Sequence, residues 1–249
     1  MKKILKFTLL ILLFAGPIFS CAKKKDEKSN AEIAYTKAMK LLKDKNYSGA
    51  AEAFIKIEDE YPFSKWALRA QNMAVYAYYK EEDYVKLYQT VDDFIRLNPA
   101  NDTVPYMMYM KGLSFYNRIP EINRAQDDTQ QASFTFRELA ARFPASVYSE
   151  DVSKKLLVVD EHLAGAKMSA GRYQAKNKNY VGAISNFIEV VERYRNTNQV
   201  PEAYFRLAEI YAKIGLKKEA IGSYQELKIQ FPENKWLSLT QKIDPYLFQ

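Results

Sequence analysis

The feature that most constrains the fold is a repeat marked by four prolines, Pro62, Pro99, Pro144 and Pro232. Twelve residues before each proline stands Ala or Leu, at positions Ala50, Leu87, Ala132 and Ala220. Eight residues before each proline stands a larger apolar residue, at positions Phe54, Val91, Phe136 and Tyr224. Arg195 takes the place of a proline in the same register, with Ala183 and Phe187 at these two positions. The shared pattern predicts five copies of one structural unit rather than a helical bundle with chance periodicity.

The spacing within one unit predicts a pair of antiparallel helices. Small residues 24 positions before the marker, Ala38, Gly171 and Ala208, would let the first helix approach the alanine of the second; Val75 is the larger residue there in the second unit. The large residue one turn later would fill the space to the next pair, and the proline would end the second helix. The pattern resembles the tetratricopeptide repeat (TPR), with a spacing of 37 residues between Pro62 and Pro99. We therefore expect an all-α, TPR-like superhelical solenoid of about five helix hairpins.

Two units depart from this spacing. Pro99 and Pro144 are 45 residues apart, eight more than 37, which predicts an insertion within Asn117–Gln131, between the two helices of the third unit. Allowing for these eight residues puts Gly112 at the position of the small residue, which supports this placement. Pro144 and Arg195 are 51 residues apart with no proline between them, which predicts one long helix over Val147–Lys176. The last segment, Lys235–Leu247, is expected to cap the open end.

The N-terminus has the pattern of a lipoprotein signal peptide. A lysine-rich start precedes nine residues, 7–15, that are almost all apolar and too few to span a bilayer. The following Ile18-Phe19-Ser20-Cys21 resembles a bacterial lipobox, and Cys21 is the single cysteine. We expect residues 1–20 to be a signal peptide and 21–30 a lipidated flexible tether, with diacylglycerol and an N-acyl chain on Cys21. The alternative is a stray thiol beside an ordinary cleavage site.

Composition argues against several kinds of function. Loss of residues 1–20 would leave a net charge of +4, too weak to indicate nucleic-acid binding. With one histidine, His162, and one cysteine, the chain lacks the residues for zinc or thiol chemistry. We find no glycine-rich phosphate loop and no nucleophile elbow, so we expect neither an enzyme, such as one acting on peptidoglycan, nor a metal or a cofactor beyond the lipid.

The first helices of the hairpins should line the inner face of the superhelix, where tyrosines are abundant. Such a groove is apolar yet can form hydrogen bonds, which suits an extended peptide with aromatic residues. The alternative is that some of these tyrosines pack between hairpins, and we expect about half to line the groove. The candidate groove residues are Tyr35, Arg69, Tyr76, Tyr79, Tyr106, Tyr109 and Tyr116.

Local strings add a family resemblance to this pattern. Tyr109-Met110-Lys111-Gly112-Leu113-Ser114 opens the third unit, and Asn179-Tyr180-Val181-Gly182-Ala183-Ile184 lies in the fourth. With the lipobox and five TPR-like units, they resemble the BamD (ComL-like) family of outer-membrane protein assembly lipoproteins, and most closely its alphaproteobacterial branch. The resemblance covers nearly the whole chain.

The resemblance implies a scaffold or receptor subunit of the β-barrel assembly (BAM) complex at the periplasmic face of the outer membrane. Repeats 1–3, residues 31–145, would receive the C-terminal segments of unfolded outer-membrane proteins. The long helix, repeats 4 and 5 and the cap, residues 146–249, would dock on the periplasmic domains of a BamA-like barrel subunit, beside other Bam lipoproteins. The candidate docking residues are Arg193, Arg195, Arg206 and Glu209. The alternative is a pilotin-like TPR lipoprotein that escorts a secretin to the outer membrane.

Overall fold

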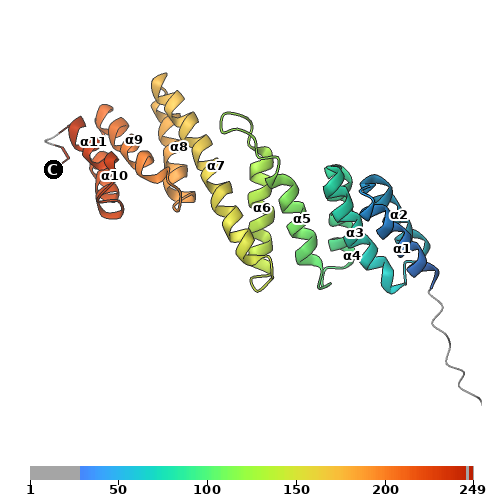
Figure 1. Cartoon of the computed structure of the whole chain (residues 1–249). Helices are drawn as coiled ribbons and strands as arrows, with labels where there is room; N and C mark the ends of the chain where they lie inside the picture. Colours follow the sequence, from blue (N-terminus) through green and yellow to red (C-terminus); the bar gives the residue numbers. More distant parts are fainter. Residues whose placement is uncertain (1–28, 245–246, 249) are drawn as a thin grey trace, which may run out of the picture.

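The computed structural model describes residues 29–244 together with residues 247 and 248, and within them the chain forms eleven α-helices and no strand. The helices form five antiparallel pairs followed by a single short helix (Figure 1). In order, they are α1 Asn30–Lys43, α2 Tyr47–Glu60, α3 Lys65–Glu81, α4 Tyr84–Leu97, α5 Val104–Tyr116, α6 Asp127–Arg142, α7 Ser149–Lys176, α8 Tyr180–Arg193, α9 Val200–Lys213, α10 Lys217–Gln230 and α11 Lys235–Ile243. This confirms the predicted all-α, TPR-like solenoid.

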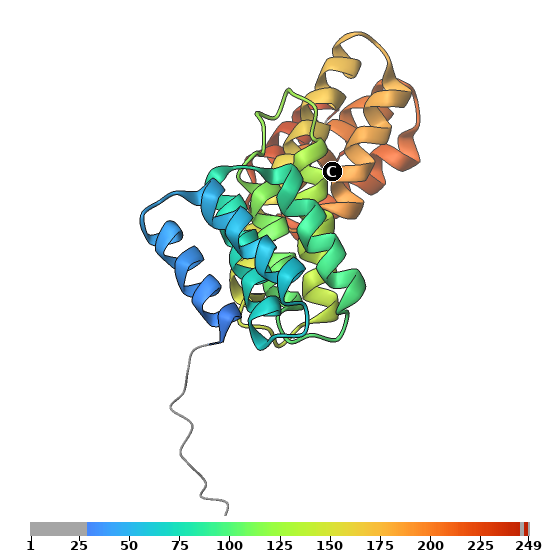
Figure 2. The ribbon, with the colours of Figure 1, turned by 90° about the vertical axis from the view of Figure 1, so that its right-hand side faces the viewer.

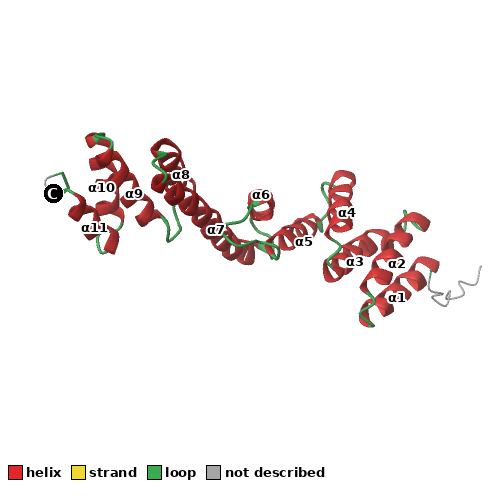
Figure 3. Cartoon of the chain, turned by 90° about the horizontal axis from the view of Figure 1, so that it is seen from above, coloured by secondary structure: helices red, strands yellow, loops and turns green. Residues whose placement is uncertain are grey.

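The pairs stack side by side into an elongated right-to-left array in Figure 1, and each pair contacts its neighbours along the chain. The array twists, so that the first and last pairs are rotated relative to one another in the view of Figure 2. Seen from above in Figure 3, the long helix α7 joins the N-terminal pairs to the C-terminal ones. Turns within a pair lie at one edge of the array, and turns between pairs lie at the other edge, where α1 begins (Figure 1).

The turn within a pair follows one rule in four of the five pairs. The chain takes a left-handed conformation at Lys45, Glu82, Lys178 and Gly215, each 17 residues before the proline or arginine that marks the unit. The next residue then caps the second helix: Asn46, Asp83 and Asn179 each accept a hydrogen bond from a backbone N–H three residues on. The fifth pair has Leu216 at this position and lacks a side-chain cap.

The end of the second helix explains the role of the prolines. The residue before each marker takes an extended φ, which a following proline favours, with φ −136° at Tyr61 and −137° at Phe231. Tyr194, which precedes Arg195, has φ −119° and ψ 44°, close to the same conformation. Arg195 therefore replaces a proline without changing how the helix ends.

The repeated small and large residues form the core as expected. The alanine or leucine 12 residues before each marker is fully buried, and so is the larger residue eight before it in the first four pairs, with Tyr224 2% exposed in the fifth. Glycine is needed where the first helix of a pair meets the large residue of the second. A Cβ on Gly112 would lie 2.3 Å from the ring of Phe136, and one on Gly171 would lie 2.5 Å from the ring of Phe187. These contacts fix the spacing of the helices within a pair.

The insertion and the long helix pack against each other. The connection between α5 and α6 runs over residues 117–126, and its Ile122 lies against Gly165 of α7. Ser169 of α7 donates a hydrogen bond of 2.7 Å to Oδ1 of Asn123. The last five residues of the predicted insertion instead begin α6, where Asp127 and Asp128 suit the positive end of a helix. The long helix α7 begins two residues later than predicted and ends as predicted at Lys176.

The short helix α11 covers the last pair. Its Trp236 packs on Phe205 of α9 with the ring centroids 4.9 Å apart, and Phe248 packs on Tyr224 of α10 at 5.4 Å. This helix occupies much of the segment that the sequence predicts as a cap.

Candidate functional site

Tyrosines of α5 and the start of α7 form the centre of the candidate peptide-binding surface. Tyr109 stacks on Tyr148, with ring centroids 4.5 Å apart and planes 17° apart. Its hydroxyl donates a 2.7 Å hydrogen bond to Oδ2 of Asp151. Tyr106, one turn earlier on α5, lies 6.4 Å from Tyr148 between centroids, and its hydroxyl is 3.4 Å from the carbonyl oxygen of Asn72 on α3. The two tyrosines therefore tie three consecutive first helices together.

Helix α3 adds two further tyrosines beside this centre. Tyr76 is exposed, with 37% of its surface accessible, and its phenol is near enough to Tyr106 to influence the pKa of that group. Tyr79 is likewise near enough to Tyr109 to influence the pKa of that group. The hydroxyl oxygen of Tyr79 accepts a 2.6 Å hydrogen bond from the side-chain amide of Asn117. We refer to Tyr76, Tyr79, Tyr106, Tyr109 and Tyr148 as the tyrosine cluster.

Burial disfavours ionisation of the two tyrosines of α5, Tyr106 and Tyr109. Burial raises the pKa of Tyr106 and of Tyr109 well above the ordinary value, and at Tyr109 the hydrogen-bonded carboxylate of Asp151 raises it further. Burial works against ionisation of Asp151, but hydrogen bonds from Lys155 and Tyr109 together lower its pKa below the usual value. The cluster thus offers aromatic rings beside one carboxylate, Asp151, that is held by Tyr109 and Lys155.

The other predicted groove residues lie at the edges of this cluster or apart from it. Tyr116 packs near Phe136, with centroids 6.2 Å apart, and the ammonium of Lys155 lies 5.2 Å from its ring centroid. Tyr35 packs instead on Trp66, with the ring centroids 4.8 Å apart. The guanidinium of Arg69 lies 5.4 Å from the centroid of the same Trp66 ring. The first two pairs therefore carry a second aromatic patch of Tyr35, Trp66 and Arg69.

Sequence reasoning missed Tyr148 and Asp151, which complete the cluster. Tyr148 directly precedes α7, the first helix of the fourth pair, and Asp151 lies in its first turn. The repeat predicts the inward-facing positions of the first three pairs. In the fourth pair the longer spacing leaves the inward-facing positions of the first helix undetermined. Trp66 was missed as well, although it lies three residues before Arg69 on the same helix face.

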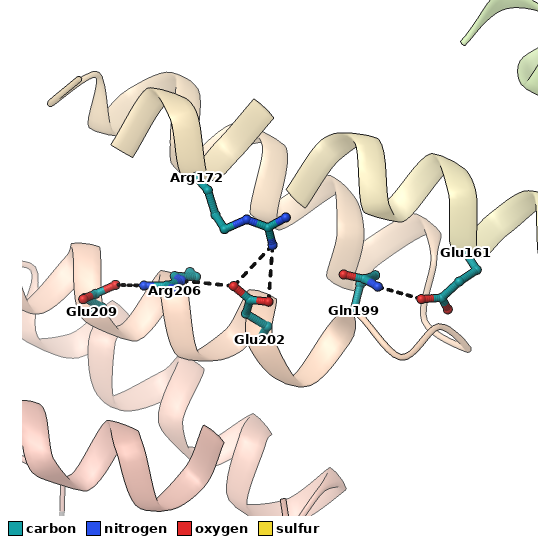
Figure 4. A network of polar contacts seen from close by, with 6 residues as sticks. All are labelled: Glu161, Arg172, Gln199, Glu202, Arg206 and Glu209. Carbon is teal, nitrogen blue, oxygen red and sulfur yellow. Dashed lines mark hydrogen bonds and ion pairs between the residues drawn. The ribbon is translucent and has the colours of Figure 1, made fainter. Parts of the chain in front are cut away.

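The four predicted docking residues fall into two places. Arg206 and Glu209 belong to α9 and bind each other at 2.9 Å, and Arg206 also contacts Glu202 at 3.3 Å (Figure 4). Glu202 accepts a second contact of 3.3 Å from Arg172 of α7, so it joins the two helices. The Arg206 guanidinium also lies 5.7 Å from the centroid of the Trp236 ring, which makes Arg206 a partly buried structural residue.

The other two predicted docking residues, Arg193 and Arg195, lie at the end of α8 and just beyond it. The Arg193 side chain is 70% exposed and lies 3.2 Å from Glu189. Arg195 donates from Nε to the carbonyl oxygen of Glu192 at 3.0 Å. Arg193 therefore presents its charge to solvent, while Arg206 is held between two carboxylates.

The sequence predictions on the N-terminus and on a metal site can be compared with the described residues. Cys21 lies outside the described residues, as do the predicted signal peptide and most of the tether. Over the described ranges, no group of three or more His, Cys, Asp or Glu side chains is placed to hold a metal ion. In the same part of the chain, none of the helices has both the length and the apolar character needed to cross a membrane.

Comparison with known proteins gives a consistent result. Residues 26–227 match a family model, YfiO, described as an outer membrane lipoprotein. The chain is 35% identical over 248 residues to the outer membrane protein assembly factor BamD of Rickettsia prowazekii, covering 98% of this chain and 97% of that protein. It is 33% identical over 235 residues to BamD of Caulobacter vibrioides, covering 92% and 77%. It is 29% identical over 219 residues to BamD of Neisseria meningitidis serogroup A, covering 84% and 82%.

Proposed function

Because this chain belongs to the YfiO family of outer membrane lipoproteins, which matches residues 26–227, we propose that it is a non-enzymatic subunit of the BAM complex that assists the assembly of outer-membrane proteins. The observation that carries this proposal is the similarity to BamD of Rickettsia prowazekii over 98% of the chain, together with the TPR-like solenoid that five helix pairs build. These relatives do not favour the alternative of a pilotin-like lipoprotein.

The proposed anchor is a lipid on Cys21, with the protein at the periplasmic face of the outer membrane. The sequence around Cys21 and the family's description as an outer membrane lipoprotein support this. A diacylglycerol and an N-acyl chain together would hold the protein firmly, because each buried methylene contributes about 0.8 kcal/mol. Cys21→Ser is expected to leave an uncleaved or soluble form. Unchanged fractionation with the outer membrane would contradict the anchor.

The tyrosine cluster is the proposed receptor for extended, aromatic-ended segments of unfolded outer-membrane proteins. Its rings offer a large contact area with few rotatable bonds to immobilise, and its hydroxyls offer hydrogen bonds to a peptide backbone. Tyr76 is the exposed member and the one best placed for contact, whereas Tyr106 and Tyr109 mainly hold the surface together. The second aromatic patch at Tyr35 and Arg69 would extend the surface toward the N-terminus.

A binding experiment tests this role of the cluster. A labelled peptide from the C-terminal end of an outer-membrane barrel protein is titrated with the protein in mild detergent. Tyr76→Ala should weaken binding by about tenfold, since loss of one aromatic contact costs about 1–2 kcal/mol. Tyr173→Ala removes a tyrosine that is 70% exposed near the end of α7, well away from the cluster in sequence, and should leave binding unchanged. Equal affinity of the parent chain, Tyr76→Ala and Tyr173→Ala for the peptide would contradict the receptor role.

The docking role is proposed for the C-terminal repeats, toward the periplasmic domains of a BamA-like subunit. Arg193 supports it because its charge is exposed, and Arg195 lies two residues further on. Arg206 and Glu209 would act mainly by shaping α9. Gentle extraction of a C-terminally tagged chain should bring down a stoichiometric barrel protein with periplasmic repeat domains. A secretin in its place would overturn the assembly role in favour of the pilotin alternative.

A further inference from the structure

A groove of about 820 Å³ opens over the middle of α7, between α6 and α8. Its floor contains Leu163, Ala166 and Ala170 of α7. Phe134 of α6 forms part of one wall and is 67% exposed, an unusual state for a phenylalanine on a helix whose other large apolar residues are mostly buried. Arg193 of α8 lines the other wall.

The groove exists because α7 is longer than the helices that cover it. Helix α7 has 28 residues, whereas α6 has 16 and α8 has 14. Helix α6 is tied to α7 at Asp160, which accepts two hydrogen bonds from Arg137 at 2.6 and 2.7 Å. Helix α8 packs on α7 farther along, where Phe187 meets Gly171. Leu163, Ala166 and Ala170 lie between these two attachments, next to Lys167, which binds Glu189 of α8.

The groove opens away from the polar contacts that join α7 to α9. Those contacts come from Glu161 and Arg172 (Figure 4). At 3.6 residues per turn, Ala166 lies about 140° around α7 from Glu161, and Ala170 lies about 160° from Arg172. A molecule in the groove would therefore leave the contacts to α9 intact.

The floor has the pattern by which one helix packs on another. Leu163, Ala166 and Ala170 stand at i, i+3 and i+7. Leu163 is only 6% exposed and closes the bottom of the groove, while the more accessible Ala166 and Ala170 permit close approach of a backbone. The walls are two helices that border this ridge on either side. The shape and the spacing thus match a fourth helix laid on α7, rather than a small molecule.

The charges around the groove specify the partner further. Glu189 is 2.7 Å from Lys167 and 3.2 Å from Arg193, so two cations share one carboxylate. Arg137, the third cation of the lining, is matched by Asp160. One positive charge is left over on the α8 side, and Arg193 presents it with its side chain 70% exposed. An acidic residue on the partner would complete this arrangement.

We propose that this groove binds an amphipathic α-helix of a partner protein, with its apolar stripe against Phe134 and the floor of α7 and an acidic residue beside Arg193. This helix-docking groove lies apart from the tyrosine cluster, and the proposal does not depend on peptide binding there. Truncation of Phe134 and reversal of the charge at Arg193 therefore weaken helix docking and leave peptide binding at the tyrosine cluster unchanged.

The test places the photocrosslinking residue p-benzoylphenylalanine at Phe134 and, separately, at Ala170 of the full chain in its native membrane. Both positions should capture the same segment of one protein, and mapping should show apolar residues at i, i+3 or i+4 and i+7 flanked by acidic residues. Arg193→Glu should lower capture by about tenfold. The same probe at Val181, which is 82% exposed on α8 but outside the groove, is the matched control and should not capture this segment.

Several outcomes would overturn the proposal. The proposal fails if the probes capture lipid, a second copy of this chain or a segment without that pattern. It also fails if neither groove position captures a protein, or if Arg193→Glu does not change the capture. Far-ultraviolet circular dichroism of each variant checks the fold, and the exposure of Phe134 and Arg193 makes both replacements tolerable.

Discussion

The close contact between Gly112 and Phe136 makes a sharp prediction about stability. Gly112 is buried in α5, and Phe136 of α6 is fully buried with its ring edge directly over the glycine. A Cβ at residue 112 would lie 2.3 Å from one ring carbon, 2.6 Å from a second and 3.0 Å from a third. Gly112→Ala therefore forces the α5–α6 pair apart or pushes the ring from its place.

Two opposing effects set the magnitude. Overpacking of a well-filled core costs about 1–3 kcal/mol, and the 2.3 Å contact with a buried ring places this site in the upper part of that range. Alanine improves the helix over glycine by about 1 kcal/mol. We expect a net destabilisation of about 1–2 kcal/mol. Gly222, in the middle of α10, is the matched control, because a Cβ there meets nothing within 4 Å. Gly222→Ala should stabilise by about 0.5–1 kcal/mol.

Urea unfolding followed by circular dichroism measures both variants against the parent chain. A second pair of measurements isolates the contact. Phe136→Leu replaces the ring by a smaller aliphatic side chain, so Gly112→Ala should cost less in the Phe136→Leu background than in the parent. The reasoning fails if Gly112→Ala and Gly222→Ala change the free energy of unfolding in the same direction. It also fails if the cost of Gly112→Ala is the same with phenylalanine and with leucine at position 136.

Three further predictions concern the turns and the tyrosine cluster. Leu216→Asn should supply the side-chain cap that α10 lacks and stabilise by about 1 kcal/mol, seen as a higher urea midpoint; an unchanged midpoint would contradict the capping role. Lys178→Gly should relieve the left-handed backbone at φ 63° and gain about 0.5–1 kcal/mol after the entropy cost of glycine; destabilisation would show that the Lys178 side chain contributes more than the strain. Burial, with Asp151 adding to it, raises the pKa of Tyr109 above its unfolded value of 10.0. The contribution of Tyr109 to the free energy of unfolding is therefore complete below about pH 10 and is lost as the pH rises further. Tyr109→Phe should therefore flatten the alkaline decline of the free energy of unfolding, and an unchanged slope would refute this.

The repeat pattern made much of the fold predictable, because its contacts are between residues near in sequence. Ala38, Gly112 and Gly171 are placed by counting back from a proline or from Arg195, and each lies in the core where that count puts it. Even the insertion was located correctly, since only its removal brings Gly112 into register. Its far end was misjudged because Asp127 and Asp128, polar enough for a loop, also suit the first turn of a helix.

The candidate surface was less predictable, because it depends on how successive pairs are rotated. The repeat indicates that Tyr109 faces inward but not that it would stack on Tyr148 of the next pair. Arg206 was predicted as a docking residue, yet Glu202 and Glu209 stand four and three residues from it on α9 and engage its guanidinium. Helical spacing was enough to find these ion pairs, but not the bridge from Glu202 to Arg172 on α7.

The long helix α7 connects the tyrosine cluster, the groove and the contacts to α9. At 1.5 Å per residue its 28 residues span about 42 Å. Its first turn holds Asp151 against the tyrosine cluster, its middle forms the floor of the groove, and Arg172 near its end contacts α9. The inserted loop braces the same helix through Ile122 and Asn123, beside Gly165, where a helix would otherwise be weakest. A single unbroken helix therefore links the N-terminal pairs to the C-terminal ones, and a movement of one set relative to the other must bend α7 or change its contacts to α5 and α6 or to α9.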